Sequence, residues 1–304
     1  MSEDCLYLNI WAPLSERIQE KVPVMVWIHG GDFWIGWSGD TNFWGDYLVN
    51  CTSDTIIITI NYRLGALGFF NSPELEGNFG FLDQQMALQW VQDHISDFGG
   101  DPNRVTIFGQ SAGAMSVLLH TLAPSSAGLF SRAISESNVG LNYRTSEENY
   151  PYSEKVSDIL GCNFTDTECL RTKSWEEIVN AQLRGYMISI PITTTEFLPY
   201  CPIIDGTVIT QQPMEQFRAG KVNTGVESII FGVNRNETLA FIPVIIPVNE
   251  LEYKTLVRAV FAENSSQVLN EYPPYRNQSN FNLVRAYYDT NRSLNLLIVL
   301  HFEY

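Results

Sequence analysis

The chain has 304 residues, of which 45% are hydrophobic and 17% are charged, the balance of a globular protein with one large domain or two small ones. Eighteen Lys and Arg residues against 34 Asp and Glu residues give a net charge of −16, which argues against nucleic acids and anionic membranes as partners. No apolar run approaches the ~20 residues of a membrane span, and the acidic start of the chain does not resemble a signal peptide.

Alternating strands and helices are predicted along the chain. The expected strands are Cys5–Trp11, Val22–Ile28, Thr55–Ile60, Arg104–Phe108, Ala133–Ser135 and Glu227–Val233. The run Val22–Ile28 is almost continuously apolar, as expected of a strand covered on both faces. Helices are predicted over Asp83–Phe98 and from Ala112 to Ala123. This alternation predicts an α/β fold, a mostly parallel sheet with helices on both faces.

The polar, Tyr-rich residues 140–225 read as irregular, and we expect them to form an insertion over the sheet rather than a separate domain. Residues 1–304 are therefore predicted to belong to a single domain.

Gly109-Gln110-Ser111-Ala112-Gly113 follows an apolar strand and leads into an amphipathic helix. This G-x-S-x-G context is typical of a nucleophile elbow, in which a serine sits on a tight strand-to-helix turn. The two glycines would let the turn close and the helix approach the strand. The alternative is a Gly-Ser turn without chemistry.

Glycosylation sequons and cysteines point to the secretory pathway. N-x-S/T sequons begin at Asn50, Asn163, Asn236, Asn264, Asn277 and Asn291, where about three would be expected by chance. Cys162 and Cys169 bracket a short polar stretch, which favours a local disulfide worth about 2.5 kcal/mol, although two unpaired thiols are the alternative. Because the chain has five cysteines, at least one of Cys5, Cys51 and Cys201 is free or has its partner outside this chain.

Several stretches together resemble the type-B carboxylesterase/lipase family, the cholinesterase-like α/β-hydrolases. They are Ser2–Asn9, His29–Phe33, Asn61–Gly65, Asn78–Gln84, Phe98–Pro102, the elbow, the Cys162/Cys169 loop, Pro202–Gly206 and Gly232–Glu237. These matches follow the family order from residue 2 to about residue 240.

The resemblance implies a serine hydrolase of small, neutral or mildly cationic esters, without a metal or an organic cofactor. Ser111 would be the acyl nucleophile, because a serine hydroxyl becomes reactive near pH 7 once a base activates it. Glu237 would orient a histidine, and backbone N–H groups of Gly31, Asp32 and Ala112 would form the oxyanion hole. Arg63 and Asp83 would form a buried structural ion pair.

The histidine base departs from the family pattern. In this fold it follows the acid, and only His301 lies after Glu237. His301 ends Leu296–His301, which reads as a helix or a buried segment, so we expect a structural role for it. His29 is assigned to the oxyanion loop, and His94 and His120 to helices.

Cys5 resembles a family half-cystine whose partner lies further towards the N-terminus. We therefore expect a fragment of a longer hydrolase that lacks the catalytic histidine, at a cost of about 10⁶ in turnover.

Asp32 also differs from the family pattern, because the family usually has a third glycine at this position of the oxyanion loop. Its side chain either turns away from the site or places a carboxylate near the oxyanion, where at ~5 Å the repulsion would be about 3 kcal/mol. That carboxylate could also act as a second base near an acyl or phosphoryl intermediate.

The aromatic residues near this loop, Phe33, Trp34, Trp37, Phe43 and Trp44, suit either an apolar gorge or ordinary packing. The rival functions are a non-catalytic adhesion or binding protein of the same fold and an inactive short paralogue.

Overall fold

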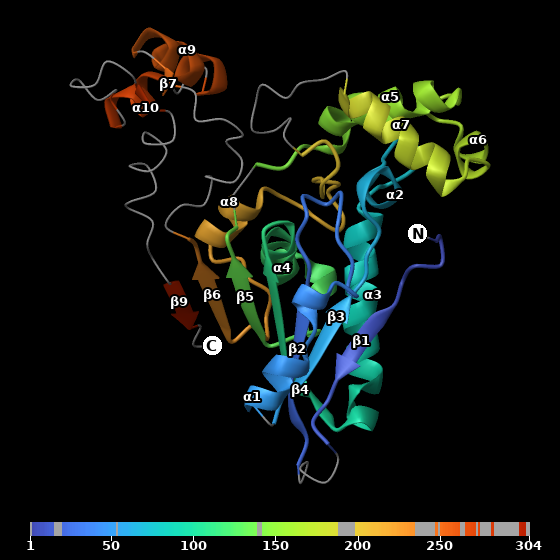
Figure 1. Cartoon of the computed structure of the whole chain (residues 1–304), viewed down its shortest axis with the longest axis vertical. Helices are drawn as coiled ribbons and strands as arrows, with labels where there is room; N and C mark the ends of the chain where they lie inside the picture. The colour runs from blue at the N-terminus through green and yellow to red at the C-terminus, as the bar shows by residue number, and fades with distance from the viewer. Residues whose placement is uncertain are drawn as a thin grey trace.

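A seven-stranded sheet forms the centre of the computed structural model, which describes residues 2–14, 20–52, 54–138, 142–187, 198–234, 247–248, 250–261, 265–271, 273, 281–282 and 298–301. The spatial order is β1-β3-β2-β4-β5-β6-β9. The strands are β1 (Leu8–Trp11), β2 (Val22–Ile28), β3 (Ile56–Ile60), β4 (Gly100–Gln110), β5 (Arg132–Glu136), β6 (Ser228–Gly232) and β9 (Ile298–His301). β2 to β6 are parallel, and β1 and β9 are antiparallel edge strands (Figure 1). The predicted α/β fold with a mostly parallel sheet is confirmed.

Helices connect the strands. They are α1 (Asp46–Thr52), α2 (Gly65–Phe69), α3 (Phe79–His94), α4 (Ala112–Leu122), α5 (Ser146–Leu160), α6 (Thr167–Arg171), α7 (Trp175–Met187), α8 (Pro213–Arg218), α9 (Glu250–Phe261) and α10 (Ser265–Glu271), with a small sheet of β7 (Pro247–Val248) and β8 (Phe281–Asn282). α3 begins at Phe79 rather than at the predicted Asp83, and its last predicted turn is a 3-10 helix, Ile95–Phe98. No helix among the described residues is long and apolar enough to cross a membrane.

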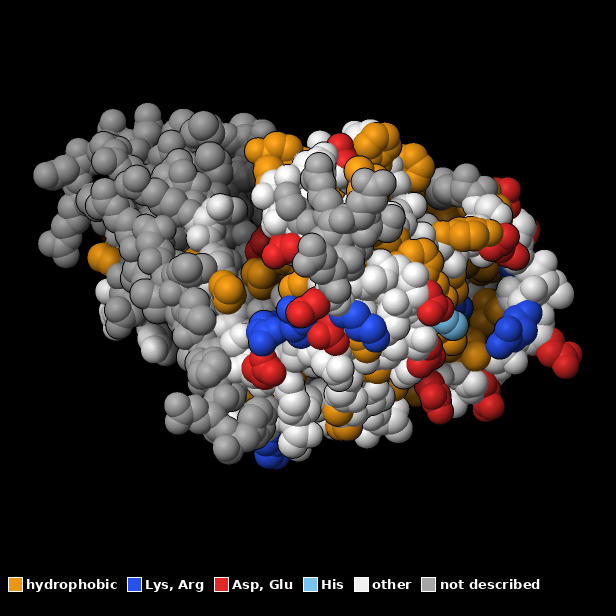
Figure 2. All heavy atoms as spheres, turned by 90° about the horizontal axis from the view of Figure 1, so that it is seen from below, with side chains coloured by type: hydrophobic (Ala, Val, Ile, Leu, Met, Phe, Trp, Pro, Cys, Tyr) orange, Lys and Arg blue, Asp and Glu red, His pale blue; other side chains and the backbone are white. Residues whose placement is uncertain are grey.

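The two faces of the sheet differ in burial. In β2, Val24 and Val26 are fully buried, whereas Met25 and Trp27 on the opposite face are partly exposed. The buried face packs on α4, where the Ser135 hydroxyl donates to the Ala114 carbonyl at 3.0 Å. β2 is therefore covered completely on one face and partly on the other, where Trp27 packs against Phe43 and Phe108. Apolar side chains also reach the surface among charged ones in the view from below (Figure 2).

The sequence predicts a helix or a buried segment for Leu296–His301. Ile298–His301 is a strand, β9, paired antiparallel with β6 so that Ser228 lies opposite His301. The helical alternative for this stretch is wrong. Its β-branched residues suit a strand, and the edge of β6 offers main-chain partners.

Residues 140–225 are more regular than predicted, because they contain α5, α6, α7 and α8. A capping box opens α5: Thr145 Oγ1 accepts the Glu148 N–H, and the Glu148 carboxylate accepts the Thr145 N–H. Ser174 and Glu177 make the same reciprocal bonds at the start of α7. Both signals were readable in the sequence as S/T-x-x-E. α5, α6 and α7 lie together beside α2 at one end of the sheet (Figure 1).

Asn78 ties this region to the core. Its buried side chain accepts the Ile203 N–H at 2.8 Å and donates to the Ile203 carbonyl at 2.9 Å and to Asp205 at 2.7 Å. Asn78 has a φ of 56°, a conformation that asparagine tolerates better than most residues. Two of the motifs that carry the family resemblance thus meet here.

The Arg63–Asp83 ion pair is present, with guanidinium–carboxylate distances of 2.7 Å. Asp83 is buried, whereas the Arg63 side chain is 39% exposed, so only the acid is buried as predicted. The hydrogen bonds that the Arg63 guanidinium donates to Asp83 raise the pKa of Arg63. The pair joins the turn after β3 to α3.

Cys162 and Cys169 form a disulfide, which decides between the two alternatives for this loop. Cys5, Cys51 and Cys201 are free thiols, of which Cys201 is buried.

Replacing Asn78 should destabilise the fold. Asn78→Ala leaves the buried N–H and carbonyl of Ile203 without partners, and we expect the free energy of unfolding to fall by about 3 kcal/mol. Denaturant unfolding measures the change. Asn42→Ala is the control, because the exposed Asn42 side chain bonds, among the described residues, to the nearby Asp40 alone, and it should change stability by less than about 0.5 kcal/mol. Equal effects of the two substitutions would contradict the anchoring role.

Candidate active site

Ser111 lies on the sharp turn between β4 and α4. Its φ of 57° and ψ of −122° are unusual for a residue with a side chain. Its N–H donates to the Glu136 carbonyl at 3.0 Å, and its own carbonyl accepts the Met115 N–H at 2.9 Å. The strand–turn–helix context predicted for a nucleophile elbow is therefore present.

Two glycines allow this turn to pack on the end of β2. A Cβ at Gly113 would lie 2.0 Å from the Ile28 carbonyl oxygen, and one at Gly109 would lie 2.6 Å from the same atom. Any side chain at either position would push α4 away from β2. The steric role expected of Gly109 and Gly113 is confirmed.

The loop after β2 lies directly against the serine. A Cβ at Gly30 would be 3.2 Å from the Ser111 Cβ. Gly31 and Asp32 have φ values of 113° and 57°, and their N–H groups donate no hydrogen bond to any described residue. Ala112 is the first residue of α4, so its N–H is one of the four at a helix start without an intrahelical acceptor. The three predicted oxyanion donors thus flank the turn that carries Ser111.

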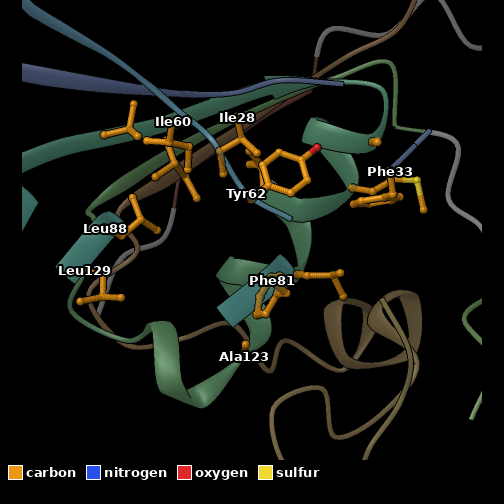
Figure 3. Packing of buried hydrophobic residues seen from close by; sticks show 14 of the residues in the cluster. Ile28, Phe33, Ile60, Tyr62, Phe81, Leu88, Ala123 and Leu129 are labelled. Atoms are coloured by element: carbon orange, nitrogen blue, oxygen red, sulfur yellow. The ribbon is translucent and has the colours of Figure 1, made fainter. Parts of the chain in front are cut away.

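Buried aromatic rings hold this loop in place. Phe33 is fully buried and meets Phe69 edge to face at 5.2 Å, and its carbonyl accepts the Gly65 N–H at 2.7 Å. The Tyr62 hydroxyl donates to the His29 carbonyl at 2.7 Å. Figure 3 shows Tyr62 and Phe33 among the buried hydrophobic residues of the core. Phe33 is therefore a core residue, whereas Trp37 and Trp44 are 63% and 50% exposed.

None of the histidines whose side chains are described is hydrogen-bonded to Ser111. His29 is buried beside Tyr62, its Nδ1 lies 2.8 Å from the Gly30 carbonyl, and burial lowers its pKa. His120 bonds to Gln84 and Ser126, and burial lowers its pKa to about 3. His94 is exposed at the end of α3. The side chain of His301, together with Glu237, Asn236, Asn264, Asn277 and Asn291, lies outside the described residues.

A polar bridge that the sequence analysis missed joins the nucleophile turn to the end of β6. The Ser137 N–H donates to the Gly232 carbonyl at 2.6 Å, and Asn234 Nδ2 donates to Ser137 Oγ at 3.3 Å. The neighbouring Glu136 carbonyl holds the Ser111 N–H. The bridge therefore connects Ser111 to the segment that leads to Glu237. The sequence feature that could have predicted this bridge is the polar run Ser135–Asn138, which ends the strand next to β4.

Asp32, in the loop after β2, and Glu136, whose carbonyl accepts the Ser111 N–H, are both partly buried. Neither forms a hydrogen bond or an ion pair through its side chain with the described residues. Burial raises the pKa of both groups. Among the described residues no group of three or more His, Cys, Asp or Glu side chains could hold a metal ion.

The chain is similar in sequence to several known proteins. The crystal protein of Dictyostelium discoideum is 41% identical over 282 residues, which are 90% of this chain and 50% of that protein. Carboxylesterase 1E of Rattus norvegicus is 37% identical over 281 residues, 88% of this chain and 49% of that protein. Mouse cholinesterase is 40% identical over 252 residues, 80% of this chain and 40% of that protein. This chain therefore spans about half the length of these relatives or less.

The solved structure of a thermophilic PNB esterase superposes with a TM-score of 0.80 at 30% identity, covering 96% of this chain and 59% of that one. A second PNB esterase gives a TM-score of 0.79. The model of the carboxylesterase family matches residues 1–295. With its parallel sheet and its strand–turn–helix serine, this chain belongs to the carboxylesterase family and has the α/β-hydrolase fold.

Proposed function

We propose that this chain carries the nucleophile and oxyanion hole of a carboxylic ester hydrolase whose substrates are small neutral or mildly cationic esters. The proposal rests on the strained turn at Ser111, packed against a loop in which the Gly31 and Asp32 N–H groups have no acceptor among the described residues. These donors are in place before a substrate binds, which is what stabilisation of a developing oxyanion requires.

In the proposed reaction, Ser111 Oγ forms a bond to the ester carbonyl carbon while a base takes the hydroxyl proton. The carbonyl oxygen becomes an oxyanion that accepts hydrogen bonds from Gly31, Asp32 and Ala112. The alcohol then leaves with a proton, and water hydrolyses the acyl-serine. Glu237 is proposed to orient the base, and the bridge through Ser137 supports this because it lies between Ser111 and the segment before Glu237.

We propose that the base is not one of the histidines of this sequence. His29 and His120 are buried with other hydrogen-bond partners, and burial lowers the pKa of both, which makes each a weaker base. On this proposal the chain alone turns over esters about 10⁶-fold more slowly than an enzyme with a complete triad.

We also propose that residues 1–304 form part of one hydrolase domain and that the protein passes through the secretory pathway. The Cys162–Cys169 disulfide supports an oxidising compartment. The six sequons are the candidate glycosylation sites.

Fluorophosphonate labelling tests the nucleophile. The probe phosphonylates an activated serine, and the tryptic peptide Val105–Arg132 contains Ser111 together with Ser116, Ser125, Ser126 and Ser131. We expect protein from the natural source to carry the label on Ser111, with the other serines of the same peptide as internal controls. Peptides that are recovered without label would count against the enzyme proposal.

The apparent mass of the labelled protein tests the base. After glycan removal, we expect the labelled band to be clearly heavier than the 34.4 kDa of this chain. A labelled band at 34.4 kDa would show that the chain contains its own base.

Asp32 is proposed to restrain acylation through its partly buried carboxylate. Removing about 3 kcal/mol of repulsion at ~5 Å corresponds to roughly a hundredfold in rate. We therefore expect Asp32→Asn and Asp32→Gly, in the active enzyme, to raise kcat on a neutral ester by up to about that factor. Asp46→Asn, the same charge change on the exposed face of α1, is the control. Unchanged kcat in both Asp32 variants would mean that the side chain turns away from the oxyanion.

The pH dependence of stability provides a separate test of Asp32. Its pKa is raised in the folded protein, so the folded state holds the proton to a higher pH than the unfolded state does. Stability should therefore fall as the pH rises from the unfolded pKa to the raised one. We expect Asp32→Asn to be more stable than the wild type at pH 7 and equally stable at about pH 3, as measured by denaturant unfolding. A stability difference that does not change with pH would contradict the raised pKa.

A further inference from the structure

The disulfide loop between α5 and α6 presents one sequon in an ordered conformation. Asn163 is exposed, and the middle residue, Phe164, packs against Phe70 and Tyr150 with ring centroids 6.2 and 5.4 Å apart. On the far side, Asp166 accepts the Cys169 N–H at 2.9 Å and caps α6. The loop is thus fixed at both ends and in its middle, while the asparagine faces solvent.

The hydrogen bonds inside this sequon leave its amide nitrogen available. Asn163 Oδ1 accepts the Thr165 N–H at 3.0 Å and the Thr165 hydroxyl at 2.9 Å. Asn163 Nδ2 donates to none of the described residues. The side chain is therefore held in a turn by its oxygen alone.

We propose that Asn163 is an N-glycosylation site of this protein, and that the folded, disulfide-closed loop is a competent acceptor. The Nδ2 atom would form a bond to the anomeric carbon of a lipid-diphosphate-linked oligosaccharide. The bond from that carbon to the diphosphate oxygen breaks, the lipid diphosphate leaves, and Nδ2 loses one proton to a base of the transferase. This inference depends on the proposed secretory location and not on ester hydrolysis.

The other described sequon provides a contrast. Asn50 lies in the last turn of α1, and its acceptor threonine, Thr52, donates its hydroxyl to the Leu48 carbonyl at 2.9 Å. The Thr52 hydroxyl is thus engaged by the helix backbone, whereas that of Thr165 is bonded to its own asparagine. Once α1 has formed, Asn50 should be a poor acceptor.

The position of the loop is compatible with a large modification. α6 lies at the outer edge of the group formed by α5, α6 and α7, away from the sheet (Figure 1). A glycan there would leave the turn at Ser111 uncovered.

The tryptic peptide Val156–Arg171 contains Asn163 and both cysteines. Its mass therefore shows whether Asn163 is glycosylated and whether the disulfide is formed. The protein from its natural source is digested without reduction and treated with peptide N-glycosidase, which converts a glycosylated asparagine into aspartate. We expect this conversion at Asn163 in most molecules, with the disulfide intact, and little conversion at Asn50.

An unmodified Asn163 in molecules that carry glycans at other sequons would overturn the inference. The absence of glycans at every sequon, with Cys162 and Cys169 as thiols, would overturn both the inference and the secretory location. Fluorophosphonate labelling of Ser111 in the same sample reports on catalysis independently.

Variants of the full chain expressed through a secretory pathway test the role of the hydroxyl. Thr165→Ala should lose the glycan and Thr165→Ser should keep it. Thr167→Ala, in the same disulfide loop but outside the sequon, is the matched control and should keep it. If all three variants have the same glycan mass at Asn163, the proposed role of the Thr165 hydroxyl is wrong.

Discussion

The contact between the elbow and the end of β2 is the constraint on which the candidate site depends. Gly109 and Gly113 bring the main chain of β4 and α4 against the Ile28 carbonyl, closer than any side chain would permit. β2 continues without interruption into the loop of Gly30 to Phe33. The serine and the proposed oxyanion donors are therefore brought together by main-chain packing, and no flexible side chain is needed to position them. An arrangement of this kind needs little reorganisation during a reaction.

Backbone strain is concentrated at the same edge of the sheet. Asp32, Phe33, Ser111 and Ser137 all have φ values between 57° and 59°, at or just beyond the ends of β2, β4 and β5. Each such residue costs on the order of 1–3 kcal/mol. Hydrogen bonds to the Phe33, Glu136 and Gly232 carbonyls hold these turns, and the burial of Phe33 anchors the loop. These hydrogen bonds and this packing thus hold the strained residues in their conformations.

The sequence predicted the parallel strands and the elbow well, because both depend on local signals. Val22–Ile28 is long, apolar and β-branched, and the glycines of G-x-S-x-G have a direct steric meaning. The partial exposure of Trp27 could not be predicted, since it depends on what packs on the second face of the sheet. Residues 296–301 were ambiguous because an apolar run of that length suits a helix and a strand equally, and only the distant edge of β6 decides. The bridge through Ser137 joins residues 97 positions apart, a separation that spacing along the chain does not reveal.

The unequal faces of the sheet also affect the behaviour of the chain in solution. Met25, Trp27, Phe108 and Ile134 lie on the partly exposed face, and an apolar surface of that kind favours self-association. The net charge of −16 opposes this through long-range repulsion between molecules. Salt shortens the range of that repulsion, to about 10 Å at 0.1 M and about 3 Å at 1 M, but leaves the apolar attraction in place. The colloidal stability of this chain therefore decreases as ionic strength rises, and it is greatest in dilute buffer well above the isoelectric point near 4.6.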